Sequence, residues 1–294
     1  MYQKIARMRY LIRLYYNMQP NVSRLSAGDM LKEIGELEKE TGCVMADSPL
    51  YSHDTALPSA PGKISHPDWP LPMRGLGSYE NAAAFIGDRS CLLLPLIDGI
   101  PFKLEYEAGE LLRVSTFAGP QGSVMDCPIR GIHGIPVKLP HKERLVIAGI
   151  MYTKHDEYYK MCEIVSEKRM AGAKDISDMA ADIIGYFGKC HLLYFDPFSI
   201  LEGLKEPFPH RYGRGKCLDR LQRYGFGHCM KVLYHEKADA QSVKMAVGKL
   251  LASVRSNGIQ VLGAAILYDD RDYADECGND VTYRLDAGTI LGYM

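Results

Sequence analysis

Residues 1–40 place apolar side chains at the three- and four-residue spacing of amphipathic helices. In the first expected helix the apolar positions are Ile5, Met8, Leu11, Ile12 and Tyr15, while another face mostly carries Lys4, Arg7, Arg9 and Arg13. Pro20 and Asn21 interrupt this pattern, and Ser26 is a suitable N-cap for a second helix that runs to about Glu40. The pattern therefore predicts a small helical unit at the start of the chain.

From about residue 90 the pattern changes to short β-like runs separated by turns. These runs cover residues 91–97, 100–106, 111–117, 134–138 and 145–152. Expected helices at 155–169, 175–187, 214–224 and 239–256 then lead towards expected strands at 191–197, 229–235 and 260–268. Residues 47–78 are rich in Pro, Ser, Gly and His, which is typical of an extended linker. This mixed order predicts an α+β fold with an antiparallel sheet.

The composition narrows the classes of protein that this chain can belong to. With 294 residues, 47% of them hydrophobic, and 35 basic against 36 acidic residues, it is an ordinary globular protein of one or two domains. A formal net charge of −1 gives no reason to expect a strongly electrostatic nucleic-acid binder as a whole. The eight cysteines form no C-x-x-C pair, so we expect no metal site and reduced thiols in a cytoplasmic protein. No apolar run approaches the roughly 18–20 residues of a membrane span, so no membrane partner is expected.

The segment from Leu92 to Tyr106 reads as an apolar strand, a turn at Asp98 and Gly99, and a second strand. A strand that ends in Asp-Gly is a common hairpin signal, so a plain hairpin is one interpretation. The segment also resembles the nucleophile motif of the covalent nucleotidyltransferases, E-x-K-x-D-G, in which the lysine takes AMP as a phosphoramidate. Here Leu94 stands at the glutamate position and Leu96 at the lysine position. Because a leucine has no nitrogen to attack phosphorus, the resemblance implies the frame of the motif without its nucleophile.

Further blocks resemble the bacterial NAD-dependent DNA ligases, in the order of that family and at nearly its spacing. Residues 31–38 and 46–49 resemble "LRELxxLE…PDSPTQ", and His66 with Pro72-Met73 resembles "H…PMLSLDN". Residues 99–112 resemble "DGLAVSLRYENGVLV", and 130–139 resemble "RTIRAIPLKL". The resemblance implies a helical N-terminal domain at 1–50, a linker at 51–78 and a degenerate adenylation (nucleotidyltransferase-like) domain with antiparallel sheets at 79–294. The OB-fold, zinc module, helix-hairpin-helix and BRCT regions of the ligase are expected to be missing.

The same resemblance indicates which functional positions have changed. The polar grip that holds the nicotinamide end of NAD corresponds here to Leu14, Tyr15, Met18, Ala27 and Gly28. Two further phosphate-binding lysines correspond to Leu267 and Tyr293, and the "RGE" strand reads Ala148-Gly149-Ile150. Such side chains neither form the hydrogen bonds of that grip nor meet the charge of a transferring phosphoryl group. We therefore expect no cofactor, no catalytic residue beyond the motif remnant Leu96, Asp98 and Gly99, and an apolar cleft.

One stretch of the chain is densely basic, and it contains Arg211, Arg214, Lys216, Arg220, Arg223 and Lys231. Tyrosines and a histidine are interleaved with these residues, as in nucleic-acid-binding surfaces. The alternative is the solvated face of an amphipathic helix. If DNA binds, we expect it on this stretch and on the first helix, which carries Arg7, Arg9 and Arg13.

These observations lead to one leading expectation and two alternatives. The leading one is a pseudoenzyme: a catalytically inactive relative of the ligase adenylation module that serves as a DNA- or protein-binding subunit in DNA replication or repair, alone or within a larger assembly. The first alternative is a divergent DNA ligase or nucleotidyltransferase subunit that is active only with a partner, or with a shifted lysine such as Lys103. The second alternative is a ligase-like inhibitor or decoy.

Overall fold

The structure is a computed structural model, and it describes most of the 294 residues. The described residues are 1–16, 25–51, 62–66, 74–117, 121–125, 129–154, 156–159, 179–180, 190–203, 214–227, 232–234, 238–268 and 282–286.

The chain begins with two packed helices, α1 (Tyr2–Tyr16) and α2 (Ala27–Thr41). The predicted N-cap is present: the Ser26 hydroxyl accepts from the Asp29 amide, and the Asp29 carboxylate accepts from the Ser26 amide. Gly42 ends α2 with φ of 65°, a left-handed conformation that suits glycine. The two helices bury a separate apolar cluster, made of Ile5, Met8, Leu11, Ile12, Met30, Ile34, Leu37, Cys43 and Met45.

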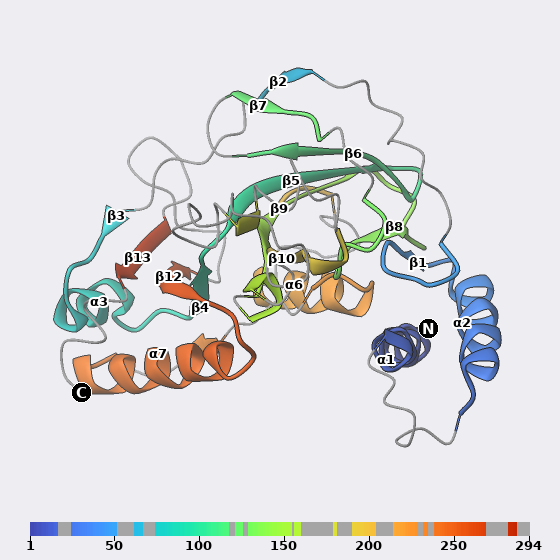
Figure 1. The fold of residues 1–294 in the computed structure, drawn as a ribbon. Helices are drawn as coiled ribbons and strands as arrows, with labels where there is room; N and C mark the ends of the chain where they lie inside the picture. Colours follow the sequence, from blue (N-terminus) through green and yellow to red (C-terminus); the bar gives the residue numbers. More distant parts are fainter. Residues whose placement is uncertain are drawn as a thin grey trace.

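The centre of the molecule is a six-stranded antiparallel sheet in the order β1-β8-β6-β5-β9-β10 (Figure 1). Its strands are β1 (Val44–Met45), β8 (Pro136–Lys138), β6 (Glu110–Thr116), β5 (Ile100–Glu107), β9 (Leu145–Tyr152) and β10 (Tyr194–Glu202). Because β1 follows α2 directly and pairs with β8, the helical pair is attached to one edge of this sheet.

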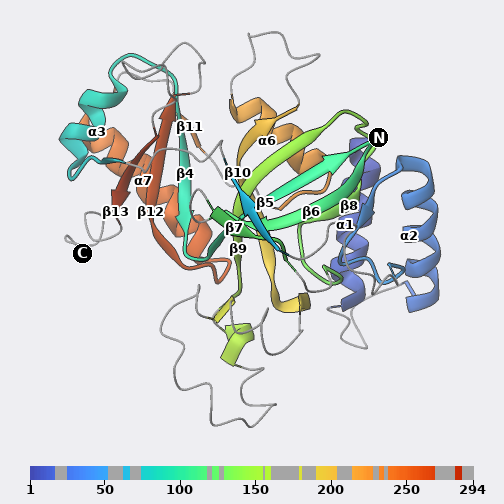
Figure 2. The same ribbon diagram turned by 90° about the horizontal axis from the view of Figure 1, so that it is seen from above.

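A five-stranded sheet in the order β11-β4-β12-β13-β3 stands beside it (Figure 2). It consists of β11 (Val232–Tyr234), β4 (Cys91–Ile97), β12 (Val261–Tyr268), β13 (Thr282–Asp286) and β3 (Arg74–Gly75). Two helices, α3 (Tyr79–Ile86) and α7 (Ala240–Arg255), pack together, and α7 contacts β4 and β12. The pairing of β3 with β13 is parallel, whereas the other pairings in this sheet are antiparallel.

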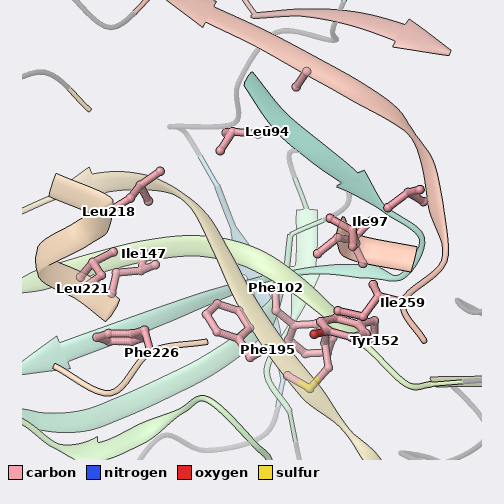
Figure 3. Packing of buried hydrophobic residues seen from close by; sticks show 14 of the residues in the cluster. Leu94, Ile97, Phe102, Ile147, Tyr152, Phe195, Leu218, Leu221, Phe226 and Ile259 are labelled. Carbon is pink, nitrogen blue, oxygen red and sulfur yellow. The ribbon is translucent and has the colours of Figure 1, made fainter. Parts of the chain in front are cut away.

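One continuous apolar core joins the two sheets (Figure 3). Ile97 at the end of β4 lies near Phe102, Tyr152 and Ile259, and Phe195 continues the core towards α6 (Arg214–Arg223). Smaller elements complete the described chain: β2 (Lys63–Ser65) pairs with β7 (Gln121–Ser123), and a short 3-10 helix covers Cys190–Leu192.

The predicted α+β class with antiparallel sheets is confirmed. The expected strand at 91–97 and helix at 239–256 match β4 and α7 closely. Part of the expected linker forms strands instead, because residues 63–65 pair with β7 and residues 74–75 pair with β13. Most of the expected helices at 155–169 and 175–187 lie outside the described residues.

Candidate functional site

The leucines of the degenerate motif lie on β4, directly opposite β12. The register pairs Leu96 with Gly263, Leu94 with Ala265, and Leu92 with Leu267. Residues directly opposite each other in an antiparallel pair share a face of the sheet. The register thus brings positions 94, 96 and 267, which the resemblance assigns to functional residues of the ligases, to one face of two neighbouring strands.

This face of β4 is apolar and packed. Leu94 is 5% exposed within the core, and Leu96 is partly buried against the same cluster. Figure 3 shows Leu94 on β4, with Ile97 further along the same strand. A phosphate placed here would lose its hydration without meeting a positive charge, at a cost of several kcal/mol or more.

The turn after β4, at Asp98 and Gly99, packs closely against β9. The Asp98 amide donates to the Gln260 carbonyl at 3.1 Å. A Cβ added to Gly99 would stand 2.5 Å from the Met151 carbonyl oxygen and 2.7 Å from Cγ2 of Ile150. Close packing therefore explains the glycine without any role in catalysis.

Lys103, the nearest lysine to the motif position of the nucleophile, lies on the opposite face of its strand from the core residues Phe102 and Leu104. Lys103 is 7% exposed and lines a cavity of about 500 Å³ on that face of the sheet. In that cavity the buried Glu105 carboxylate accepts from Arg113 at 3.1 Å and from Arg144 at 3.5 Å. Lys103 therefore lies beside an ion-pair network and does not point towards Leu94 and Leu96.

The expected cofactor positions are dispersed in the structure. Tyr15 is partly buried against the helical cluster, and Ala27 and Gly28 are exposed at the start of α2. Met18 and Tyr293 lie outside the described residues. Of the positions that the resemblance assigns to the NAD grip, Leu14, Tyr15, Ala27 and Gly28 are described, and Tyr15 alone among these four has a polar side-chain group.

The basic stretch lies partly on α6. Arg214 and Lys216 belong to the first turn of α6, and Arg211 and Lys231 lie outside the described residues. Arg220 donates from Nε to the Tyr224 hydroxyl at 2.8 Å, and the Arg223 guanidinium lies 5.4 Å from the Tyr2 ring centroid. These two arginines therefore also make contacts within the protein, and Arg223 contacts α1.

A cleft that the sequence did not indicate lies between α1 and the six-stranded sheet, and we call it the α1 cleft. Its volume is about 800 Å³, and its walls come from several separate segments of the chain. Arg9, Arg13 and Tyr16 line it from one side of α1, at the spacing of a single helix face. The charged and aromatic residues of the other walls are Asp47, Arg130, His133, Tyr152, Lys154, Glu157, His191, Tyr194 and Phe195.

An aromatic stack forms one wall of the α1 cleft. The rings of His133 and Tyr194 are 4.7 Å apart at 27°, and Tyr152 stacks with Tyr194 at 5.6 Å and 24°. Lys154 Nζ lies 4.5 Å from the Tyr194 ring centroid, a cation–π contact. Burial and the nearby Glu157 carboxylate raise the pKa of Tyr194, whose hydroxyl donates to Glu157 at 2.9 Å. The phenol therefore stays neutral and serves as a fixed ring.

His133 is held at both ring nitrogens. Nδ1 lies 2.7 Å from Oδ2 of Asp47, and Nε2 lies 2.9 Å from the His191 carbonyl oxygen. The other Asp47 oxygen, Oδ1, is buried and has no hydrogen-bond partner within the described part of the chain. The cleft thus combines basic groups and a rigid aromatic surface with one buried acceptor that has no partner in the described chain.

Weak signals for this cleft exist in the sequence. Arg9 and Arg13 stand out as basic positions on the first helix, and Arg130 and His133 fall in the block that resembles "RTIRAIPLKL". No sequence pattern joins these positions to Lys154 or Tyr194, because only the folded chain brings the segments together.

Neither a membrane-spanning helix nor a metal site is found among the residues that the structure describes. The described helices include none that is long and apolar enough to cross a bilayer. No three His, Cys, Asp or Glu side chains gather around a possible metal position in the described ranges.

Comparison with known proteins indicates a distant relationship to DNA ligases. No known protein-family profile matches the chain. A DNA ligase of Ruminiclostridium cellulolyticum is 20% identical over 292 residues, which cover 98% of this chain and 44% of the ligase. DNA ligases of Halothermothrix orenii and Mycoplasma capricolum are 24% and 26% identical, over 62% and 55% of this chain and 32% and 25% of those ligases. The chain is thus ligase-like, and it spans less than half the length of these relatives.

Proposed function

We propose that this protein is a ligase-like, DNA-binding subunit that does not form a covalent intermediate with AMP. The observation that carries this proposal is the buried apolar face of β4, where Leu94 and Leu96 occupy the motif positions. The motif keeps Gly99, which the packing requires, and this supports retention of the fold. Leucines stand where the ligase motif has polar residues, and this supports loss of adenylyl transfer.

The DNA-binding part of the proposal is supported by two features. The relatives named above are DNA ligases, and the α1 cleft places four basic side chains, Arg9, Arg13, Arg130 and Lys154, around one hollow that holds two carboxylates. One of the carboxylates, Glu157, pairs with Lys154 at 3.6 Å, so Arg9, Arg13 and Arg130 are the main source of positive charge. Such a surplus of positive charge attracts the phosphates of nucleic acid.

The catalytic part is tested by incubating the chain with Mg²⁺ and with NAD or ATP labelled in the phosphate of the AMP moiety. We expect no labelled protein after denaturing electrophoresis and no added AMP by intact mass spectrometry. A DNA ligase from one of the named relatives serves as the positive control. A stable protein–AMP adduct would overturn the proposal.

DNA binding is tested by fluorescence anisotropy with labelled oligonucleotides at low and moderate salt. Affinity is expected to fall steeply as salt rises, because bound phosphates displace counterions. If no DNA binds, a pull-down from lysate tests whether the chain binds proteins instead. Half of the sample is treated with nuclease, and partners that remain bound after digestion indicate a protein-binding subunit.

A further inference from the structure

The α1 cleft has basic groups on two sides. Arg9 and Arg13 come from successive turns of α1, whereas Arg130 and Lys154 come from segments that border the six-stranded sheet. A chain of phosphates that passes between these sides meets positive charge from both of them. A compact anion such as inorganic phosphate would meet only part of it.

The stack beside these groups offers a flat ring surface. His133 keeps 22% of its side chain exposed while Tyr194 supports its ring at 4.7 Å. Hydrogen bonds at both ring nitrogens fix the plane, so little conformational entropy is lost when another ring stacks on it. Base–aromatic stacking contributes roughly 1–3 kcal/mol per base in proteins that bind single strands.

Asp47 adds selectivity to the cleft. Its buried Oδ1 is an acceptor without a partner in the described chain, and its charge disfavours a phosphate at that point. Because this atom is buried, a ligand donor reaches it only when the Asp47 side chain turns towards the cleft, where an N–H or O–H group next to the phosphates would satisfy it. Nucleotide bases have N–H donors of this kind, whereas a fully deprotonated anion such as sulfate has none.

We propose that the α1 cleft binds single-stranded DNA, with phosphates along Arg9, Arg13, Arg130 and Lys154 and an unpaired base stacked on His133. This inference rests on the proposed DNA-binding function and specifies where and in which form DNA binds. A base must be unpaired to stack on His133, because both faces of a base inside a duplex are already covered by its neighbours. Basic grooves with aromatic platforms are typical of single-strand binding.

Among the described residues, none of the positions that the ligase resemblance assigns to the NAD grip lines the cleft. Arg9, Arg13 and Tyr16 line the cleft, whereas the mapped residues Leu14 and Tyr15 pack against the helical cluster. The proposed site is therefore formed by another face of α1.

The test measures anisotropy of the 294-residue chain with a labelled single strand, the matching duplex, and a strand of equal length whose bases are replaced by abasic sites. We expect the single strand to bind more tightly than either the duplex or the abasic strand. The double variant Arg13→Glu with Arg130→Glu should weaken single-strand binding at least about tenfold. It should also reduce the salt slope by roughly 0.7 for each phosphate that the variant no longer neutralises.

The matched control is Lys39→Glu with Lys249→Glu, which changes the net charge equally at two exposed positions on α2 and α7. It should bind within about twofold of the wild type, because long-range charge effects are largely screened beyond a Debye length of roughly 10 Å. Circular dichroism melts verify the fold of each variant, and Arg13→Gln with Arg130→Gln replaces the reversal variant if that one fails to fold.

The remaining outcomes separate the cleft from DNA binding in general. Equal binding by the cleft variant and the wild type would overturn the inference and direct attention to α6, while DNA binding itself stands. Tighter binding of the duplex, or equal binding of the abasic strand, would also overturn it. No binding of any DNA by the wild type would overturn the proposed function.

Discussion

At the residue scale, the turn after β4 is fixed by close packing of Gly99 against β9. Gly99 lies against the backbone of β9 with no room for a Cβ atom, and Asp98 is 5% exposed and bonded to Gln260 through its amide. Packing at these two positions does not depend on what occupies positions 94 and 96. Packing alone is therefore sufficient to explain the glycine at position 99.

Gly99→Ala is expected to lower the free energy of unfolding by about 1–3 kcal/mol, the usual cost of overpacking a dense site. Its control is Gly248→Ala in α7, where an added Cβ meets nothing within 4 Å. That substitution should be neutral or stabilise by up to about 1 kcal/mol, because alanine favours helix. Urea unfolding measures both, and a neutral Gly99→Ala would contradict the packing explanation.

Leu96→Lys is expected not to restore adduct formation with labelled NAD or ATP. In this variant Leu94 still stands at the glutamate position and Leu267 at a lysine position. These two leucines offer no charge to the phosphates of NAD or ATP. Leu262→Lys on β12, where the native side chain is 54% exposed, is the matched surface control. A labelled Leu96→Lys chain beside an unlabelled control would show that the site keeps more of its chemistry than we propose.

The sequence predicts the motif strand and its turn well, because a continuous apolar run followed by Asp-Gly is a local signal. It does not predict the α1 cleft. His133 and Tyr194 are far apart in the chain and stack only after β10 lies beside the loop that precedes β8. Long-range contacts of this kind leave no periodic pattern in a single sequence.

At the element scale, α2 carries a partly buried acidic side chain, Glu38, close to Ser48 in the segment after β1. Glu38 Oε1 is buried without a hydrogen-bond partner in the described chain, and burial raises the pKa of this carboxyl, partly offset by a hydrogen bond with Ser48. The folded state therefore prefers the protonated form. Its stability contribution falls as pH rises from the ordinary pKa of 4.5 through the raised value, and stays low above it.

Glu38→Gln is accordingly expected to stabilise the protein at neutral pH, with the gain disappearing as pH falls below 4.5. Glu36→Gln, an exposed position on the same helix, should show no such pH-dependent gain. Urea unfolding at several pH values measures the difference between the two variants. A loss of stability at neutral pH would show that the charged carboxylate is favoured in the folded state.

The elements that the sequence predicts well are those with their own periodicity or caps. Ser26 caps α2 as expected, and α7 differs from the expected helix by one residue at each end. The strands β2 and β3 escape sequence prediction because two or three residues carry no periodicity, and each exists through its pairing with a distant strand. The parallel β3–β13 pair likewise has no local signal.

At the scale of the whole molecule, two apolar clusters are the main structural units. One lies between α1 and α2, and the other joins both sheets and α6. The connections between them include the hydrogen bond from Cys43 Sγ to the Tyr224 carbonyl oxygen at 3.3 Å. Burial raises the pKa of Cys43 to about 12, so this thiol stays protonated and keeps its proton for that bond at neutral pH.

Met8→Ala is expected to destabilise the helical cluster by about 2–5 kcal/mol, since Met8 is fully buried there. Hydrogen exchange should accelerate in α1 and α2 while β4, β5 and β9 keep their protection, because local units open separately. Met245→Ala on α7, where the side chain is 52% exposed, is the control and should change neither region. Equal loss of protection in the sheets would show that the two clusters unfold as one unit.

The α1 cleft lies between α1 and the six-stranded sheet, so a ligand bound in it stabilises the attachment of the helical pair to the sheet. Detaching the helices would empty the cleft, so occupancy at roughly a hundred times Kd opposes detachment by about 2.7 kcal/mol. The coupling is reciprocal: a change that favours detachment of α1 from the sheet weakens ligand binding, and the coupling free energy is the same in both directions. For the proposed single strand, a change that separates α1 from the sheet would therefore weaken binding in the α1 cleft.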